Sequence, residues 1–328
     1  MVSSPSHPPH PGQRHELNPA QQQVVDLLGS AEGDRPQFDA GLRHELRATL
    51  EHELEPVVAR LPDGEQLFVS KYKLSQAHGC EARYLAEDKA DFSWSVPTAR
   101  GSIAHKAIEL GVSWRGEAVP ADLVDETMAR LAQGNDGLGD WLRTCGDVDR
   151  AELRGRSIER VTSFFECFPP LKASWRPVLE GKVRVELFDA RIVLSGKTDL
   201  ALGTAHGTTA GKVLIDFKTG GFAPTHIDDL RFYALLETLK IGTPPRLVAS
   251  YYLESAELHP ERVNEAILDA ALARTVDGID RMVALLYGDD EPTRRTGATC
   301  RWCPILDDCE MGQAHLAGDD PESFDDDD

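Results

Sequence analysis

Residues 196–220 read GKTDLALGTAHGTTAGKVLIDFKTG and contain two β-type runs joined by a turn rich in Gly and Thr. In the second run, KVLIDFK at 212–218, apolar and polar side chains alternate. Successive side chains of a strand point to opposite faces, so Asp216 and Lys218 share one face, about 7 Å apart. The turn would pair the two runs antiparallel and bring Asp199 close to them. Two carboxylates and a lysine there predict a site for a hard divalent cation. On the Asp-x-Lys pair alone, a surface salt bridge is the simpler interpretation.

The overall composition is that of a globular protein. The 328 residues are 41% hydrophobic, with a mean hydropathy of -0.35. No apolar run approaches the roughly 20 residues that span a bilayer, and the N-terminus lacks the pattern of a signal peptide. We therefore expect a cytoplasmic protein with no membrane partner. In that compartment its six cysteines are expected to be reduced thiols or metal ligands rather than disulfides.

The charge is strongly acidic, with a net value of -20. This value argues against a surface that binds polyanions in general. Nucleic acid could still bind in a local groove lined by basic side chains. Part of the charge is segregated in residues 317–328, which carry seven acids and no base. Such a segment is expected to be a disordered acidic tail.

The order of predicted elements indicates one main domain. Residues 1–34 are expected to be a mostly disordered extension with one short helix, which begins at Pro19 with Asn18 as its cap. A domain over 35–316 follows, with a helical insertion at about 120–170. The expected elements are a packing helix over 38–60, a strand and a helix capped by Ser75 over 71–86, a helix near 101–110, strands over 177–252 interrupted by a helix over 228–239, and a long helix over 260–287. This order predicts an α/β fold with a mixed central β-sheet flanked by helices.

Three thiols within ten residues, Cys300, Cys303 and Cys309, form the most specific motif. Such a cluster in a reducing compartment indicates a metal. Structural zinc sites usually draw their ligands as two close pairs, and the other three cysteines are isolated, at positions 80, 145 and 167. Three ligands plus one suit a 4Fe-4S cluster, which takes four thiolates. Zinc, bound with Cys80 or His78, remains the alternative.

Together these motifs resemble the iron–sulfur branch of the PD-(D/E)XK nuclease superfamily, which includes RecB/AddB nuclease domains and CRISPR adaptation exonucleases. The resemblance covers residues 70–310. The motifs that match the family are LSQAHGCEARYL at 74–85 with Cys80, G-x-x-x-H at Gly101 to His105, G-x-x-D at Gly196 to Asp199, (D/E)-x-K at Asp216 to Lys218, DLRFY at Asp229 to Tyr233, and the three C-terminal cysteines. Asp229 departs from the family, which has glutamine there. The added negative charge would repel phosphate unless a neighbour such as Arg231 compensates.

The resemblance implies a restriction-endonuclease-like core and a role for each matched residue. His105, Asp199, Asp216 and the main-chain carbonyl of Phe217 would bind Mg²⁺ or Mn²⁺. Lys218 would act at the attacked phosphate, and Tyr233 would brace Lys218 or a phosphate. Glu180 is a candidate additional acid, although a solvated glutamate is an equally good interpretation. A 4Fe-4S cluster on Cys80, Cys300, Cys303 and Cys309 would form a clasp joining the N- and C-terminal parts of the domain.

The function implied by the resemblance is a metal-dependent DNA nuclease. It would be an exonuclease on DNA ends or single strands in repair or recombination. No phosphate-binding GxxxxGK[ST] motif occurs, so any helicase would be a separate partner. The first alternative is a non-catalytic, nuclease-like subunit that binds DNA or a helicase, and the acidic charge and Asp229 favour it. The second is a zinc-stabilised interaction module.

Overall fold

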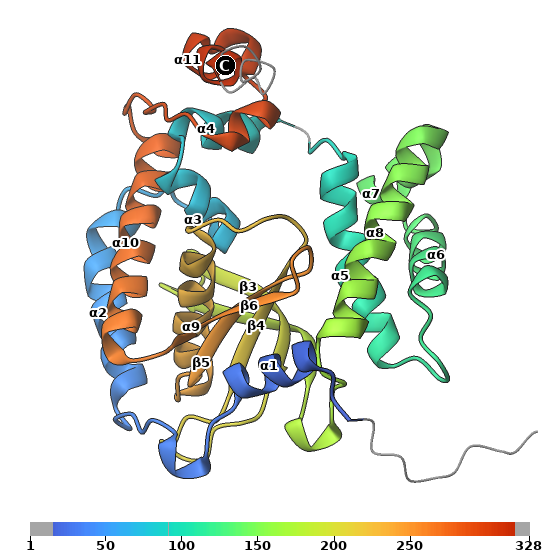
Figure 1. Ribbon diagram of the computed structural model, residues 1–328. Helices are drawn as coiled ribbons and strands as arrows, with labels where there is room; N and C mark the ends of the chain where they lie inside the picture. Colours follow the sequence, from blue (N-terminus) through green and yellow to red (C-terminus); the bar gives the residue numbers. More distant parts are fainter. Residues whose placement is uncertain (1–15, 91, 319–328) are drawn as a thin grey trace, which may run out of the picture.

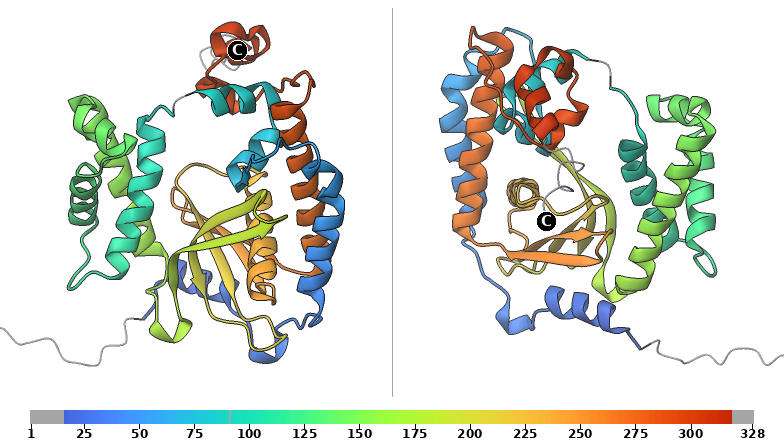
Figure 2. Two further views of the ribbon diagram at one scale, coloured as in Figure 1. Left: turned by 180° about the vertical axis from the view of Figure 1, so that it is seen from behind. Right: turned by 45° about the horizontal axis from the view of Figure 1, so that its top comes forward.

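The computed structural model of the chain describes residues 16–90 and 92–318. The expected disordered residues 1–15 lie outside the described residues, as do residues 319–328 of the acidic tail expected over 317–328. Residues 317 and 318 of that expected tail instead end a helix, Glu310–Gly318. Figure 1 shows a central sheet with helices on both sides, and the two views of Figure 2 show the same layers from behind and from above. None of the described helices is long and apolar enough to cross a membrane.

The described strands form one mixed sheet, which confirms the predicted fold class. The order is β1-β3-β4-β5-β6, and β2 pairs with β3. β1 is parallel to β3 and β4 to β5, whereas the other pairs are antiparallel, including the predicted pairing of β3 with β4. The strands are β1 (Leu67–Val69), β2 (Val178–Leu187), β3 (Ile192–Leu202), β4 (Val213–Lys218), β5 (Leu247–Tyr252) and β6 (Glu257–Arg262).

Two strands differ from the sequence-based expectation. The first β-type run of residues 196–220 is not a strand of its own but the second half of the longer strand β3, which begins at Ile192. The sequence ELHPER of β6 has no alternating apolar pattern and was not predicted as a strand. Its charges and Pro260 suit a strand at the edge of a sheet, where β6 has only β5 as a neighbour.

The strand β3 has three neighbours, and this sharing creates a fork. β2 occupies one edge of β3 from Ile192 to Ala201. The other edge pairs with β1 up to Leu194 and with β4 only from Leu200 onward. Residues 195–199 therefore have no strand partner on that second edge. Asp199 lies in this gap, between the end of β1 and the end of β4.

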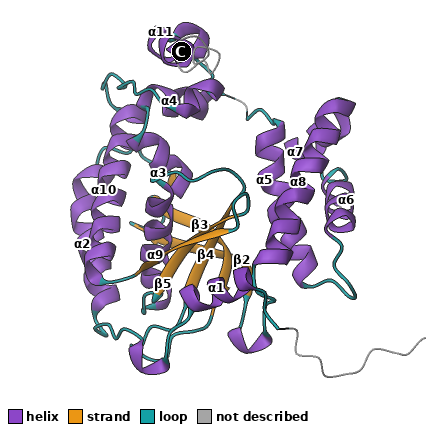
Figure 3. Ribbon diagram, in the orientation of Figure 1, coloured by secondary structure: helices purple, strands orange, loops and turns teal. Residues whose placement is uncertain are grey.

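Helices cover both faces of the sheet (Figure 3). On one face, α2, α3, α9 and α10 pack in one apolar core, and the predicted stripe of leucines in α2 is buried there. On the other face, α1, α5, α6, α7 and α8 contribute to a second core. The helices are α1 (Pro19–Leu28), α2 (Leu42–Val58), α3 (Lys71–His78), α4 (Glu81–Lys89), α5 (Val96–Val112), α6 (Pro120–Leu131), α7 (Gly137–Thr144), α8 (Asp147–Cys167), α9 (His226–Ile241), α10 (Glu265–Tyr287) and α11 (Glu310–Gly318), with short 3-10 turns at Glu32–Asp34, Ala173–Trp175, Ala298–Trp302 and Leu306–Asp308.

The segment after β1 corrects the expected helix start. The strand ends at Val69 rather than continuing past residue 71, and the hydroxyl of Ser70, not Ser75, accepts a hydrogen bond from the Lys73 N–H at 3.3 Å. Helix α3 therefore begins at Lys71, and a second helix, α4, begins after Cys80. As a result Lys71 directly follows a strand that ends at the fork. The cap of α1 agrees with expectation, because the Asn18 side chain accepts from the Gln21 N–H at 2.9 Å.

Candidate active site

A main-chain N–H of β4 holds Asp199 in the fork. The β3–β4 ladder ends at the pair Leu200 and Ile215, so the N–H of Phe217 has no strand partner there. It donates instead to Oδ2 of Asp199 at 2.6 Å. Asp199 is buried, with 5% of its surface exposed. The carboxylate is therefore fixed by the sheet itself.

Two further side chains that could bind a metal lie beside Asp199. Nδ1 of His105, from α5, lies 3.0 Å from Oδ1 of Asp199. Potential ligand atoms of His105, Glu180 and Asp199 all lie within 4.8 Å of one another. Glu180 sits opposite Asp199 in the β2–β3 register, with a left-handed φ of 53°. That uncommon conformation for a non-glycine residue redirects its side chain at this point of the strand. Lys197 forms an ion pair with Glu180.

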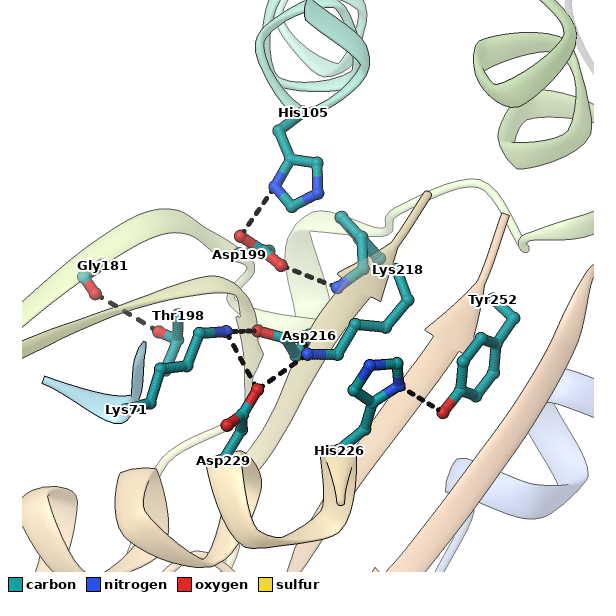
Figure 4. Close-up of polar contacts among 11 residues, drawn as sticks. Lys71, His105, Gly181, Thr198, Asp199, Asp216, Lys218, His226, Asp229 and Tyr252 are labelled. Carbon is teal, nitrogen blue, oxygen red and sulfur yellow. Dashed lines mark hydrogen bonds and ion pairs between the residues drawn. The ribbon is translucent and has the colours of Figure 1, made fainter. Parts of the chain in front are cut away.

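Asp216 belongs to an adjacent network of four charges (Figure 4). Its carboxylate lies 2.6 Å from Nζ of Lys71 and 3.0 Å from Nζ of Lys218. Asp229 of α9 lies 2.9 Å from Lys218 and 3.8 Å from Lys71. We call these residues, Lys71, Asp216, Lys218 and Asp229, the ion quartet. Two ammonium groups and two carboxylates balance in charge, so the negative charge of Asp229 is compensated within the quartet.

Protonation in the site follows from these neighbours. Burial opposes ionisation of Asp216, but Lys71 and Lys218 outweigh it and hold the pKa of that carboxyl well below its usual range. Burial likewise disfavours the charged form of Lys71, but Asp216 and other neighbours raise the pKa of that amine above its usual value. Burial would lower the pKa of His105, yet Asp199 and two further carboxylates raise it. Asp216 and Lys71 therefore face each other as a carboxylate and an ammonium group at neutral pH.

Tyr233 contacts a different lysine from the expected one. Nζ of Lys71 lies over its ring, 5.0 Å from the centroid, and burial, the largest cause, raises the pKa of the Tyr233 hydroxyl. The same ring also packs on Gly196. A Cβ at position 196 would lie 2.9 Å from Cδ1 of Tyr233 and still closer to Cε1. The glycine of the G-x-x-D motif is therefore required by the tyrosine ring.

Arg231 does not compensate for the charge of Asp229. Its guanidinium forms two hydrogen bonds to Glu261, at 2.6 and 2.9 Å, and lies 3.7 Å from Asp228. The compensating cations are Lys218 and Lys71. The sequence did not identify Lys71 as a site residue, because it was expected to lie in a strand that begins at residue 71. The signal was Ser70, a helix-capping residue one position before it.

The cysteines from the two ends of the domain meet in one cavity. Cys80, at the start of α4, lines it together with Cys300, Cys303 and Cys309. Gly312 of α11 closes it, since a Cβ there would lie 3.5 Å from Sγ of Cys309 and 3.8 Å from Sγ of Cys300. Cys145 and Cys167 do not line this cavity.

Polar contacts tie the same two segments together. Glu81 accepts hydrogen bonds from the N–H and the hydroxyl of Thr293, at 2.8 and 2.7 Å. The N–H of Ala82 donates to the carbonyl of Thr293 at 3.2 Å. Residues more than 200 positions apart in the chain are thus joined beside the cysteines, as Figure 1 shows near α4 and α11.

Two solved structures align with most of the chain. A presumed exonuclease from Eubacterium rectale matches at 12% identity with a TM-score of 0.43, covering 85% of this chain and 93% of its own. The protein SSO0001 matches at 12% identity with a TM-score of 0.35, covering 81% and 95%. Neither score supports an inference about this chain, and no curated protein matches it.

A model of the PD-(D/E)XK nuclease superfamily matches residues 69–310. That range is most of the chain and includes the ion quartet, the His105 cluster and the cysteine cavity. The chain belongs to the PD-(D/E)XK nuclease superfamily.

Proposed function

We propose that this protein is a metal-dependent nuclease that hydrolyses phosphodiester bonds of DNA. The observation that carries the proposal is the group formed by His105, Glu180 and Asp199, whose donor atoms lie within 4.8 Å of one another. The hydrogen bond from the Phe217 N–H to Asp199 joins this group to the strand that carries Lys218, in a chain of a nuclease superfamily. Oxygen donors suit Mg²⁺, and the imidazole nitrogen favours Mn²⁺ over it.

Asp216 and the main-chain carbonyl of Phe217 are proposed as further ligands of the same cation. The fit depends on charge. Glu180 has one lysine partner, Lys197, whereas Asp216 is paired with both Lys71 and Lys218. A bound divalent cation would polarise a phosphate oxygen and lower the pKa of a water molecule at this site.

The lysines supply fixed positive charge for the phosphate. Lys218 and Lys71 are held by Asp216 and Asp229 on the same side of the sheet, so their ammonium groups need no rearrangement when negative charge builds up on a substrate. Asp229 is a positioning residue in this scheme, because it contacts both lysines. The Tyr233 ring packs against the Lys71 ammonium, which lies over its face.

The cysteine cavity is proposed to hold a 4Fe-4S cluster. Four thiols line it, which is the ligand number of such clusters. A cluster held by Cys80 and the three C-terminal cysteines would close a loop of about 220 residues and stabilise the domain.

The proposed substrate is the end of a DNA chain during repair or recombination, with a separate helicase as a possible source of single strands. The second candidate function is a non-catalytic subunit that binds DNA or a helicase. The observation in its favour is that both candidate catalytic groups of the D-x-K motif, Asp216 and Lys218, are already ion-paired in a chain of net charge -20.

A nuclease assay separates the two candidates. Anaerobically purified protein is incubated with labelled single-stranded and duplex DNA in Mn²⁺, in Mg²⁺ and in EDTA. Asp199→Asn and Lys218→Met should each lower the rate at least about 100-fold. Asp125→Asn and Lys240→Met, which change the same residue types at exposed positions away from the site, should leave it unchanged. Metal-independent cleavage, or none of any substrate, would contradict the proposal.

The cluster has its own test, independent of cleavage. Cys80→Ser should abolish the visible absorbance and the bound iron and sulfide, whereas Cys167→Ser should retain them. If the wild-type protein contains stoichiometric zinc and no iron, the cysteine cavity holds a zinc site and not a 4Fe-4S cluster. An unchanged spectrum in Cys80→Ser would remove Cys80 from the ligand set.

A further inference from the structure

A large cavity lies next to the candidate active site and is lined by exposed aromatic rings. Its volume is ≈ 720 Å³, within the usual range of ligand sites. Tyr72, Phe92 and Trp302 line it, with 54%, 65% and 59% of their surfaces exposed. They come from α3, from the segment before α5 and from the cysteine segment. We call this feature the aromatic cavity.

Two helices, α3 and α5, contribute residues both to the aromatic cavity and to the active site. Helix α3 places Lys71 in the ion quartet, and the next two residues, Tyr72 and Lys73, in the cavity. Helix α5 contributes Thr98 to the cavity and His105 to the metal-binding group. These two residues are seven positions apart, or about 10 Å along a helix. The cavity is therefore an approach to the site rather than a separate pocket.

The charges that line the cavity are already paired. Lys73 lies 3.2 Å from Asp88, and Arg83 lies 2.6 Å from Glu87. These are the lysine and arginine of the lining. Phosphate groups would find little net positive charge here, in keeping with the acidic chain. What the cavity offers a ligand is the flat faces of its rings.

We propose that the aromatic cavity binds unpaired bases of a single-stranded DNA end whose backbone continues to the metal-binding group. This inference rests on the proposed nuclease function and adds the strand form of its substrate. Base stacking on aromatic side chains provides sequence-tolerant binding that needs no phosphate contact. The roughly 10 Å from Thr98 to His105 is short enough for a strand of a few nucleotides to span both places. Paired bases in a duplex have no free faces to offer.

The position of Trp302 links this cavity to the cysteines. Trp302 lies between Cys300 and Cys303, and Pro304 beside them also lines the cavity. The cysteine centre therefore positions one stacking ring. Loss of the centre is expected to weaken binding of single strands as well as stability.

Binding is tested on the full-length, anaerobically purified protein in EDTA, so that no cleavage occurs. The probes are a fluorescent oligothymidine and a strand of equal length in which abasic sites replace the bases. Wild-type protein should bind the oligothymidine at least about fivefold more tightly, because stacking of one base gives roughly 5-fold to 100-fold. The dependence of binding on salt should be shallow, because few phosphates are neutralised.

The variants use matched changes. Phe92→Leu and Trp302→Leu should each weaken binding of the oligothymidine about tenfold while leaving binding of the abasic strand unchanged. Trp302→Phe, which keeps an aromatic ring, should bind the oligothymidine almost as tightly as the wild type does. Phe68→Leu is the control, since Phe68 is 45% exposed but its ring contacts Arg184 instead of the cavity.

The outcomes separate this inference from the proposed function. If the wild type binds both strands equally, or if the cavity variants bind oligothymidine like wild type, the cavity does not take bases and the inference is wrong. Cleavage by wild type in Mn²⁺ could still be intact in that case. If the base-dependent binding is present but no DNA is cleaved in any metal, the cavity assignment stands and the nuclease proposal fails.

Discussion

The ion quartet gives the most quantitative prediction. Removing one lysine or one acid leaves an unbalanced charge in a part of the site where Asp216 has only 3% of its side chain exposed. Breaking a buried ion pair in this way typically costs about 3–5 kcal/mol. Lys71 is 27% exposed and Asp216 keeps Lys218 as a partner, so we expect Lys71→Met to cost about 3 kcal/mol, at the lower end of that range.

The counterpart change is Asp229→Asn. It removes one acid near Lys71 and Lys218, leaves a net positive charge and should cost about 2 kcal/mol. In the double variant Lys71→Met with Asp229→Asn, one cation and one anion remain, Lys218 and Asp216 at 3.0 Å. Charge balance is restored, so the double variant should be less destabilised than the sum of the singles, by about 1–2 kcal/mol.

The assay is thermal unfolding followed by circular dichroism under anaerobic conditions. For a chain of this size, about 1 kcal/mol shifts Tm by about 2 °C, so Lys71→Met should lower Tm by about 6 °C. Arg130→Met, which breaks an exposed pair with Glu126, is the control and should cost about 0.5 kcal/mol or less. Strictly additive single and double variants would refute the electrostatic coupling of the quartet.

Three further predictions follow from particular contacts. Gly196→Ala should destabilise the protein by about 1–3 kcal/mol, because its methyl group would overlap the Tyr233 ring, whereas Gly155→Ala, with open space around it, should not destabilise; chemical denaturation measures both, and equal stabilities would disprove the clash. Asp216 has a pKa below its ordinary value of 3.8, so its stabilising charge is complete above that pH and is lost as the pH falls through the lower folded-state pKa. The acid limb of a Tm–pH profile should therefore be shallower in Asp216→Asn, and superimposable profiles would contradict this. Glu180→Gln should raise the Mn²⁺ concentration for half-maximal cleavage at least about tenfold, and an unchanged metal titration would exclude Glu180 as a ligand.

Much of the fold was predictable because its signals are local. The alternation in KVLIDFK, the leucine stripe of α2 and the cap at Asn18 each depend on residues a few positions apart. The edge strand β6 was missed because it carries no such local signal. Pairing with β5 on one side stabilises it, so it does not need an apolar pattern of its own. The start of α3 was displaced because two serines, Ser70 and Ser75, could both cap a helix, and the end of β1 decided between them.

The sequence by itself determined which chemical groups the site contains. The motifs with His105, Asp199, Asp216 and Lys218 predicted a histidine, carboxylates and a lysine close together, and the structure brings all four to the same end of the sheet. It also determined that a lone cysteine and a distant group of three could share one centre, and these four thiols line one cavity.

Only the tertiary structure decided how those groups are partnered. β3 pairs with β1 and β4 along one edge and leaves residues 195–199 free between them, so Lys71, which follows β1, reaches Asp216, near the end of β4. No local pattern encodes that meeting, because the two residues are 145 positions apart in the chain. The same fork explains why Asp229 is an acid: it balances a second lysine that becomes visible only when the sheet is assembled.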